Sequence, residues 1–325
     1  MNKPRKVIAF ARYRDWGLLL VCNLIWGSQF VVYKIVQRQV GPVFAALFPI
    51  TCAVLLMIPL VHRTRQKNKF TRRRVSNRKA DILQFLLIGI CGQVVAQLGV
   101  AWGVRLTLAS DAALLALILP IATAFMACLF LGERMTLIRW VGFALAIAGV
   151  VECSGIRWSN LNLMNSKFLL GNLILFSAIN GSAFYNAYSK KLLVRHSLLE
   201  VLLYSYYVVV AVMLPIAIST EPQSFMNIPK FTASVWVGFL ILAVFQYFLA
   251  MLIFLSVLRR LDAIQVGLSN YLITFFGVLI AALGLHERLT KYMISGGIVV
   301  LAATVLVTVY ESRARSQTKA GASQP

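Results

Sequence analysis

The amino-acid sequence predicts an all-α polytopic membrane protein with ten transmembrane helices, arranged as two inverted five-helix repeats. The first observation is composition, since 60% of the 325 residues are hydrophobic and 13% are charged, against roughly a quarter charged in ordinary soluble domains. The second is that the apolar residues form runs of the ~20 residues that a helix needs to cross a bilayer. The third is an internal repeat, in which residue types recur 154 positions further along the chain.

Ten apolar runs predict the helices, because backbone polar groups within lipid have to be paired inside their own segment. Barrel strands would alternate apolar and polar side chains, and these runs do not alternate. The first five helices are expected at 16–36, 42–61, 82–104, 108–131 and 137–154. The last five are expected at 168–188, 198–218, 234–257, 264–285 and 292–310.

Five regions follow from these runs. Residues 16–154 are expected to form the first repeat and residues 168–311 the second, joined by an external linker at 155–167. Residues 1–15 and 312–325 are expected to be basic or polar cytoplasmic tails. The apolar run at 16–36 is too long for a secretory signal and is expected to remain as the first helix.

The basic residues predict the orientation. The net charge is +22, and 14 of the 32 Lys and Arg residues lie in the tail 1–15 and the loop 62–80. Loops rich in Lys and Arg stay on the cytoplasmic side, so both termini are expected in the cytoplasm, with the protein in the plasma or inner membrane. Because the charge is spread over loops and tails, the expected partners are the lipid bilayer and a small-molecule substrate, and not nucleic acid.

The repeat is clearest in two stretches, LFLGERMTLIRWVGF at 129–143 and LGLHERLTKYMISGG at 283–297. It extends to WGS at 26–28 and NGS at 180–182, which are also 154 positions apart. An odd number of helices per copy makes the second copy enter the membrane from the opposite side. Inverted repeats are a plan of secondary transporters, with the substrate site near the midplane between the repeats.

Polar side chains inside the predicted helices are the candidate substrate-binding residues, because polarity without a partner is costly within lipid. Amides and aromatic rings suit a zwitterion or another polar solute. The alternative role is hydrogen bonding between helices, and the sequence does not separate the two roles for any one residue. The candidates are Trp26, Gln29, Gln93, Gln97, Asn180, Tyr185, Gln246 and Asn270.

Four charged residues are candidates for gating or coupling: Lys34, Asp111, Glu133 and Glu287. Glu133 and Glu287 belong to the repeated turn, and turn chemistry is their alternative role, with Gly132 ending the preceding helix in a left-handed conformation. Asp111 and Lys34 lie near helix ends, where an interfacial position is the alternative. The helix at 16–36 has no carboxylate in its middle, so proton coupling would need other groups.

No catalytic or cofactor-binding pattern is present in the sequence. The three histidines fall in loops or at helix ends, and the five cysteines have no metal-ligand spacing. We therefore expect no enzyme, no metal and no cofactor. A non-transporting binding or receptor protein and an intramembrane enzyme are the alternative functions.

The small residues Gly142, Ala146 and Gly149 predict a helix-packing stripe, either within one chain or in a homodimer.

Taken together, these stretches resemble the EamA family of the drug/metabolite transporter superfamily. The resemblance rests on NLIWGSQFVVYKIV at 23–36, GERMT at 132–136, HERLT at 286–290 and the tandem halves, and covers about 16–311. It implies ten helices, cytoplasmic termini, a central cavity, and transport, often export, of small metabolites such as amino acids. His286 stands where the family usually has Gly, and Asn180 where the first half has Trp26. Both departures concern the symmetry of the two gates.

Overall fold

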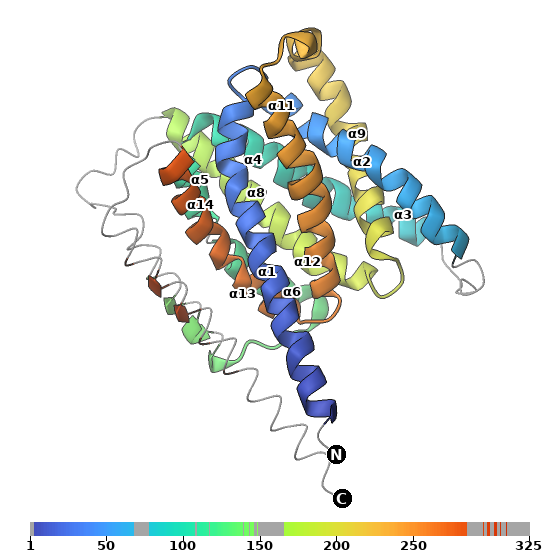
Figure 1. Cartoon of the computed structure of the whole chain (residues 1–325), viewed down its shortest axis with the longest axis vertical. Coiled ribbons are helices and arrows are strands. Elements are labelled where there is room, and N and C mark those ends of the chain that lie inside the picture. Colours follow the sequence, from blue (N-terminus) through green and yellow to red (C-terminus); the bar gives the residue numbers. More distant parts are fainter. Residues whose placement is uncertain are drawn as a thin grey trace, which may run out of the picture.

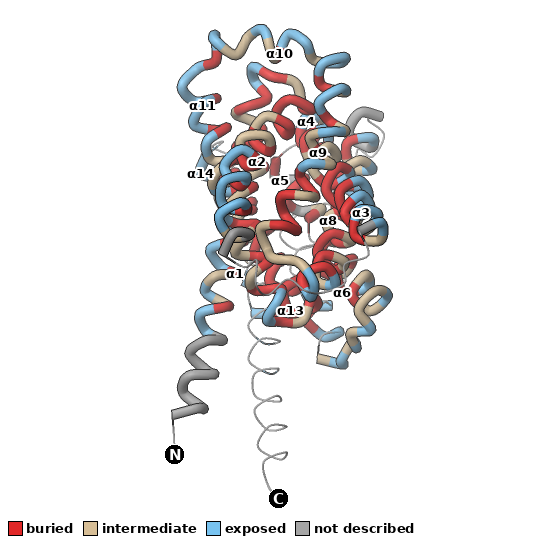
Figure 2. Tube along the Cα trace, turned by 90° about the vertical axis from the view of Figure 1, so that its right-hand side faces the viewer, coloured by how far each residue is buried: buried red, intermediate tan, exposed pale blue. Residues whose placement is uncertain are grey.

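The computed structural model describes residues 3–67, 78–107, 109–116, 118–138 and 166–284, with a few positions between 140 and 148 and between 295 and 310. Six helical stretches of this part of the chain are long and apolar enough to cross a membrane. They pack side by side around a buried centre (Figure 1; Figure 2). These stretches are Tyr13–Val36, Pro42–Thr64, Lys79–Leu106, Leu198–Thr220, Ala233–Leu258 and Ala263–Gly284.

The helices of the two halves follow one another in the same order. The first half contains α1 (Lys3–Val36), α2 (Pro42–Lys67), α3 (Arg78–Leu87), the π-helical η2 (Ile88–Val94), α4 (Val95–Leu106), α5 (Ala109–Leu115) and α6 (Ile118–Leu131). The second half contains α8 (Ser166–Leu192), α9 (Leu198–Thr220), α11 (Ala233–Leu240), the π-helical η5 (Ile241–Ala250), α12 (Met251–Leu258), α13 (Ala263–Ser269) and α14 (Tyr271–Gly284). The short helices α10 (Pro222–Met226) and η4 (Ile228–Lys230) join α9 to α11.

Each described helix of the first half has its counterpart in the second half at the 154-residue offset. Shifted by 154 positions, α5 coincides with α13, and α6 begins and ends one residue later than α14. The same shift carries η2 onto 242–248, inside η5. The internal repeat of the sequence is therefore a repeat of structure.

Hydrogen bonds at the two ends of the bundle fix the direction of each helix. We call one end the Asp15 end, because the carboxylate of Asp15, near the start of α1, accepts bonds of 2.7 and 3.1 Å from Arg260 at the end of α12. We call the other the Gln37 end, where Arg105 at the end of α4 donates to the carbonyl oxygen of Gln37 at 2.6 Å. The equivalent helices α4 and α12 therefore end at opposite ends of the bundle.

The other helix pairs obey the same rule. Glu133, just after α6, bonds both Lys190 at the end of α8 and Ala263 at the start of α13, so these three points lie at the Asp15 end. Val43, at the start of α2, bonds Glu221 just after α9, which places both at the Gln37 end. Thus α1 and α8 run in opposite directions, as do α2 and α9 (Figure 1).

Two helices that the sequence predicts as continuous are interrupted. The predicted helix 108–131 divides into α5 and α6 near Ala116, and the predicted helix 264–285 divides into α13 and α14 at Asn270, its counterpart. Pro120 explains the first break, because it has no N–H to bond the carbonyl of residue 116 and its ring crowds that carbonyl. The second copy has no proline there, and its break is a tight turn in which Asn270 N–H bonds the oxygen of Gly267.

One further boundary differs, and several predicted segments lie outside the described residues. Residues 3–15, expected as a tail, continue α1 as a helix. The predicted helices 137–154 and 292–310 fall largely outside the described residues, as do the linker 155–167 and the tail 312–325. Ala146 and Gly149 of the small-residue stripe also lie outside them.

Helix α1 lies between α14 on one side and η5 and α12 on the other (Figure 1). Gly27 permits the contact with α14, since a Cβ atom there would lie 2.8 Å from the Cβ of Phe276 and 2.9 Å from the backbone nitrogen of Gly277. Real Cβ atoms do not approach other atoms so closely. The glycine of the WGS stretch therefore brings the first helix of one half against the last described helix of the other.

Candidate functional site

A cavity of about 80 Å³ lies at the centre of the bundle, between the two halves of the chain. Seven of its lining residues come from each half. Those of the first half are Trp26, Gln29, Gln93, Ala96, Gln97, Val100 and Leu119, and those of the second are Ser182, Tyr185, Asn186, Gln246, Tyr247, Met251 and Ile273. This volume holds a few water molecules, at about 10–15 Å³ each, or one small solute.

Six of the eight candidate residues line this cavity, namely Trp26, Gln29, Gln93, Gln97, Tyr185 and Gln246. The two asparagines do not. Asn180 lies on the outside of α8, where its Nδ2 donates to the carbonyl of Phe176 in the same helix at 2.9 Å. Asn270 is fully buried at the break between α13 and α14, away from the cavity wall.

One side of the cavity carries a hydrogen-bonded pair of glutamines from adjacent turns. Gln97 Nε2 donates to Gln93 Oε1 at 2.9 Å, and the hydroxyl of Tyr247 donates to Gln97 Oε1 at 3.1 Å. Gln93 lies in η2 and Gln97 in α4, while Tyr247 lies in η5. Both π-helical segments therefore contribute a side chain to this wall, and the Gln97 amide is held by a contact between the halves.

A second glutamine pair bridges the halves on another wall. Gln246 Nε2 of η5 donates to Gln29 Oε1 of α1 at 2.8 Å, which leaves the buried Gln246 Oε1 without a partner among the described residues. Trp26, one turn before Gln29, packs against Phe254 with ring centroids 5.0 Å apart. The wall thus combines an aromatic surface with an unused hydrogen-bond acceptor.

The lining is polar but carries no formal charge. None of the described residues that line the cavity is an acid, a lysine, an arginine or a histidine. An ion with a net charge would have no counter-charge there, and burying it would be costly. A net-neutral solute with hydrogen-bonding groups, including a zwitterion, suits this lining best.

The sequence also offers Asn186 beside Tyr185 as a polar residue within the apolar run 168–188, and it lines the cavity, but sequence reasoning missed Ser182 and Tyr247. For Ser182 the signal was helical spacing, because Ser182 and Asn186 lie four residues apart and share a helix face. Asn180 lies five residues before Tyr185, which turns it well away from that face. Tyr247 follows Gln246 directly, and both lie in the π-helical η5 and line the cavity.

Asn270 belongs to a separate buried polar group. Beside it in the chain, Ser269 accepts a 3.1 Å hydrogen bond from Asn23 Nδ2 of α1. Both polar atoms of the Asn270 side chain are buried without a partner among the described residues. These contacts link α1 to the broken helix, and they correspond to the hydrogen bonding between helices that was the alternative role for the candidates.

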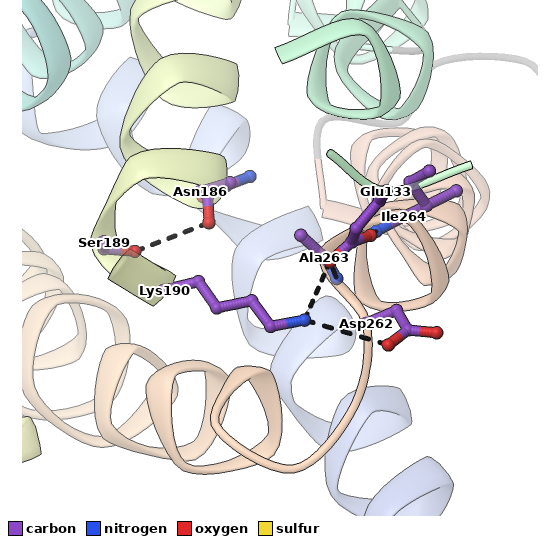
Figure 3. A network of polar contacts seen from close by, with 7 residues as sticks. All are labelled: Glu133, Asn186, Ser189, Lys190, Asp262, Ala263 and Ile264. Carbon is purple, nitrogen blue, oxygen red and sulfur yellow. Dashed lines mark hydrogen bonds and ion pairs between the residues drawn. The ribbon is translucent and has the colours of Figure 1, made fainter. Parts of the chain in front are cut away.

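Glu133 forms a polar network at the Asp15 end of the bundle (Figure 3). Its carboxylate accepts hydrogen bonds from the backbone N–H groups of Ala263 and Ile264 at 2.9 and 3.0 Å, which are the first two of α13. Its Oε1 also lies 2.8 Å from Lys190 Nζ, and that nitrogen lies 3.9 Å from the Asp262 carboxylate. A carboxylate at a helix N-terminus is favoured by both hydrogen bonding and the helix dipole.

The predicted turn before Glu133 is confirmed, since Gly132 has a φ of 65° and ends α6 in the left-handed region. Lys34 Nζ, at the other end of the bundle, donates to the carbonyl oxygen of Thr107 just after α4. Glu287 and the side chain of Asp111 lie outside the described residues. Of the four candidates for gating or coupling, Glu133 therefore has the clearest structural role, as a link between the halves.

Two repeated sets of helices that run in opposite directions around a polar cavity define a class of membrane transporters. The model of the EamA-like transporter family matches residues 16–153 and 169–309. The chain belongs to this family, and it is a multi-pass membrane protein.

Known proteins are similar to this chain in sequence or in fold. The chain is 28% identical over 208 residues to a protein of Streptantibioticus cattleyicolor described as a probable terminal-alkyne amino-acid exporter, covering 62% of this chain and 63% of that relative. It is 22% identical over 296 residues to an uncharacterized transporter of Archaeoglobus fulgidus, covering 90% and 96% of the two chains. A protein of known crystal structure has the same fold, with a TM-score of 0.71, 15% identity, and coverage of 93% of this chain and 98% of that one.

Proposed function

We propose that this protein is a secondary transporter that exports small, net-neutral polar metabolites such as amino acids. It has ten transmembrane helices in two inverted five-helix repeats, with both termini in the cytoplasm and the chain in the plasma or inner membrane. The solute binds in the central cavity, which opens alternately to the two sides. No cofactor takes part.

The observation that carries this proposal is the uncharged amide lining of a cavity built equally from both halves. Four glutamines present carbonyl oxygens and N–H groups, and Trp26 and Tyr185 add aromatic surface. Together these groups match an ammonium group, a carboxylate and a small side chain. Because the net charge of a zwitterion is zero, this uncharged lining can bind it without a counter-charge.

The opposite directions of equivalent helices support alternating access. When one half rocks against the other, the contacts that close one end of the bundle open while those at the other end close. Both ends already have such contacts, Glu133 with Lys190 and α13 at the Asp15 end, and Glu221 with the start of α2 at the Gln37 end. The relative from Streptantibioticus cattleyicolor, named as a probable amino-acid exporter, favours amino acids as the first solutes to test.

The test is exchange of labelled solutes by the purified protein in liposomes loaded with the unlabelled solute. The panel comprises leucine, threonine, phenylalanine, an amino acid with a terminal-alkyne side chain, and a phosphorylated sugar. We expect saturable exchange of at least one amino acid and none of the phosphorylated sugar. Gln246→Leu or Gln93→Leu should lower exchange tenfold or more, because a buried hydrogen bond to a charged group is worth about 1.5–3 kcal/mol.

Asn180→Leu is the matched control, since it makes the same amide-to-leucine change on the outside of α8. Exchange should stay within about twofold of the unchanged protein. No exchange of any solute by inserted, folded protein would contradict the proposal and favour the binding or receptor alternative. Chemical conversion of the solute would favour the enzyme alternative.

A further inference from the structure

Two tyrosine hydroxyls lie behind the Gln93–Gln97 wall of the cavity. The hydroxyls of Tyr33 in α1 and Tyr247 in η5 are hydrogen-bonded to each other. Tyr33 is fully buried and Tyr247 is 1% exposed. Tyr247 also bonds Gln97, which in turn bonds Gln93. The four side chains form a single row that begins in the packed interior and ends at the cavity.

The protons of the two hydroxyls determine the orientation of the Gln97 amide. Each hydroxyl carries one proton and needs one acceptor. When Tyr33 donates to Tyr247 and Tyr247 donates to Gln97 Oε1, each of the two hydroxyl protons has an acceptor. If the amide were reversed, its N–H2 group would face Tyr247 and one buried hydroxyl proton would lack an acceptor, at a cost of about 1–3 kcal/mol.

A third buried tyrosine, Tyr206, does not affect the orientation of the Gln97 amide. The hydroxyl of Tyr206 donates to the backbone oxygen of Tyr247 at 3.0 Å, so its proton is placed elsewhere. Tyr206 is fully buried as well, and it does not line the cavity. It therefore contributes packing and one hydrogen bond to the backbone, without touching Gln97.

The fixed Gln97 amide in turn fixes Gln93. Because Gln97 Nε2 faces Gln93, Gln93 has to accept through its Oε1, at 2.9 Å. The group that remains at the cavity end of the row is the N–H2 group of Gln93, and Gln93 and Tyr185 both line the cavity. Every hydrogen bond along the row thus points the same way, and the row ends in donors.

The other glutamine pair has no such polarity. Gln29 and Gln246 make one hydrogen bond to each other, and no tyrosine hydroxyl is bonded to either amide among the described residues. Whichever way the two amides are turned, one carbonyl oxygen and one N–H2 group are left over. The leftover groups of that wall include an acceptor, whereas the Gln93–Gln97 row leaves an N–H2 donor at its cavity end.

We infer that the buried hydroxyl of Tyr247 sets the polarity of the Gln93–Gln97 wall, and that this wall binds the carboxylate of the transported solute. Tyr247 acts as a positioning residue through Gln97, and Gln93 touches the solute. The inference rests on the proposed function for the identity of the solute as an amino acid. It assigns the ammonium group of that solute to the opposite wall, where Gln29 and Gln246 supply an acceptor.

The test compares an acid with its amino alcohol. Leucine, threonine and phenylalanine are each paired with the alcohol in which CH2OH replaces the carboxylate. For each pair, the ratio of concentrations that half-inhibit exchange gives the preference for the carboxylate. We expect the unchanged protein to prefer the acid at least tenfold. Tyr247→Phe should reduce this preference about tenfold, because the Gln97 amide is then free to turn.

Tyr206→Phe is the matched control, because it removes a hydroxyl of the same kind from the same buried cluster but leaves Gln97 fixed. The preference for the acid should stay within about twofold. Tyr33→Phe should also leave the preference within about twofold, because Tyr247 keeps its proton for Gln97. Equal loss of preference in Tyr206→Phe and Tyr247→Phe, or no loss in either, would overturn the inference.

A second measurement separates this inference from the proposed function. The same acids and alcohols are added to the purified protein, and the shift in its unfolding temperature is measured, which requires binding but not transport. Stabilisation by the acids that is lost in Tyr247→Phe and kept in Tyr206→Phe would support the inference even if no solute were transported. Equal stabilisation by acid and alcohol, or none by any acid, would overturn it even if transport were found.

Discussion

Glu133 and Lys190 are joined by a 2.8 Å ion pair, although one follows the last described helix of the first half and the other ends the first helix of the second half. The same carboxylate holds the first two N–H groups of α13. One side chain therefore ties α6 to two helices of the other repeat. The Asp15–Arg260 pair adds a second tie at this end of the bundle.

Removal of the Glu133 carboxylate should destabilise the protein. The side chains of Glu133 and Lys190 are 13% and 24% exposed, so both are largely shielded from water. Glu133→Ala should cost about 2 kcal/mol, since it removes an ion pair and two charge-assisted hydrogen bonds. Thermal unfolding of the single variants and the double variant with Lys190→Ala gives the coupling energy of the pair.

Lys191→Ala is the control for that cycle, because Lys191 is exposed and its neighbour Lys190 makes the contact. The coupling of Glu133 with Lys191 should be near zero. A coupling as large as that with Lys190 would contradict a specific ion pair and indicate a general effect of charge.

Removal of both the Glu133–Lys190 and the Asp15–Arg260 ion pairs should open the Asp15 end of the cavity. Asn186 lines the cavity one turn before Lys190 on α8. In a chain whose own cysteines are replaced, Asn186→Cys reports access from this end through its reaction rate with a membrane-impermeant thiol reagent. Adding Glu133→Ala and Arg260→Ala should raise this rate about tenfold. A loss of about 1.4 kcal/mol from the free energy that keeps this end closed raises the open population by a factor of ten.

The opposite end supplies the comparison for this experiment. Glu221 makes two similar hydrogen bonds, of 2.9 and 2.8 Å, to the start of α2 at the Gln37 end. Glu221→Ala should leave the rate from the Asp15 end unchanged or lower it. A similar rise in both variants would mean that the changes loosen the whole bundle.

The orientation in the membrane should follow the basic residues. Arg195 is exposed in the turn between α8 and α9 at the Asp15 end, and Gln223 is exposed in α10 at the Gln37 end. With cytoplasmic termini, Gln223→Cys should be labelled on intact cells, and Arg195→Cys only after permeabilisation. The reverse pattern would contradict the orientation expected from the positive-inside rule.

The α1–α14 contact should not tolerate a methyl group. Gly27→Ala would bring its Cβ within 2.9 Å of the backbone of α14, and overpacking of this kind costs about 1–3 kcal/mol. We expect a lower unfolding temperature and a weaker exchange activity. Gly17→Ala lies in the same helix with no atom within 4 Å of the added Cβ, so it should be neutral or slightly stabilising.

Much of the site could be predicted from the sequence because polar residues within long apolar runs are few. Gln93, Gln97 and Gln246 were candidates either for lining a cavity or for hydrogen bonding between helices, and the structure places all three at the cavity wall. Asn180 was a candidate for the same reason, as an amide within an apolar run, but residue type alone does not show which face of a helix a residue occupies, and Asn180 lies on the outside of α8. The turn at Gly132 was predicted because a left-handed glycine before a polar residue is a local signal.

Other features depend on contacts that no local pattern encodes. Tyr33 and Tyr247 are 214 residues apart and meet only when α1 packs against η5. The break at Asn270 lacks the proline that marks its counterpart near Ala116, so periodicity alone predicts a continuous helix. The cap that Glu133 provides for α13 joins the two halves, and a sequence offset shows that the halves are alike but not where they touch.

The two π-helical segments bear on the history of the chain. A π turn holds more residues than an α turn, and η2 and η5 occupy equivalent positions in the two halves. The 154-residue offset is the same before these segments, at WGS and NGS, and after them, at the repeated turns. A residue gained in one half alone would have changed the offset at that point. The widened turn therefore belongs to the repeated unit itself, and neither half has gained or lost a residue there relative to the other.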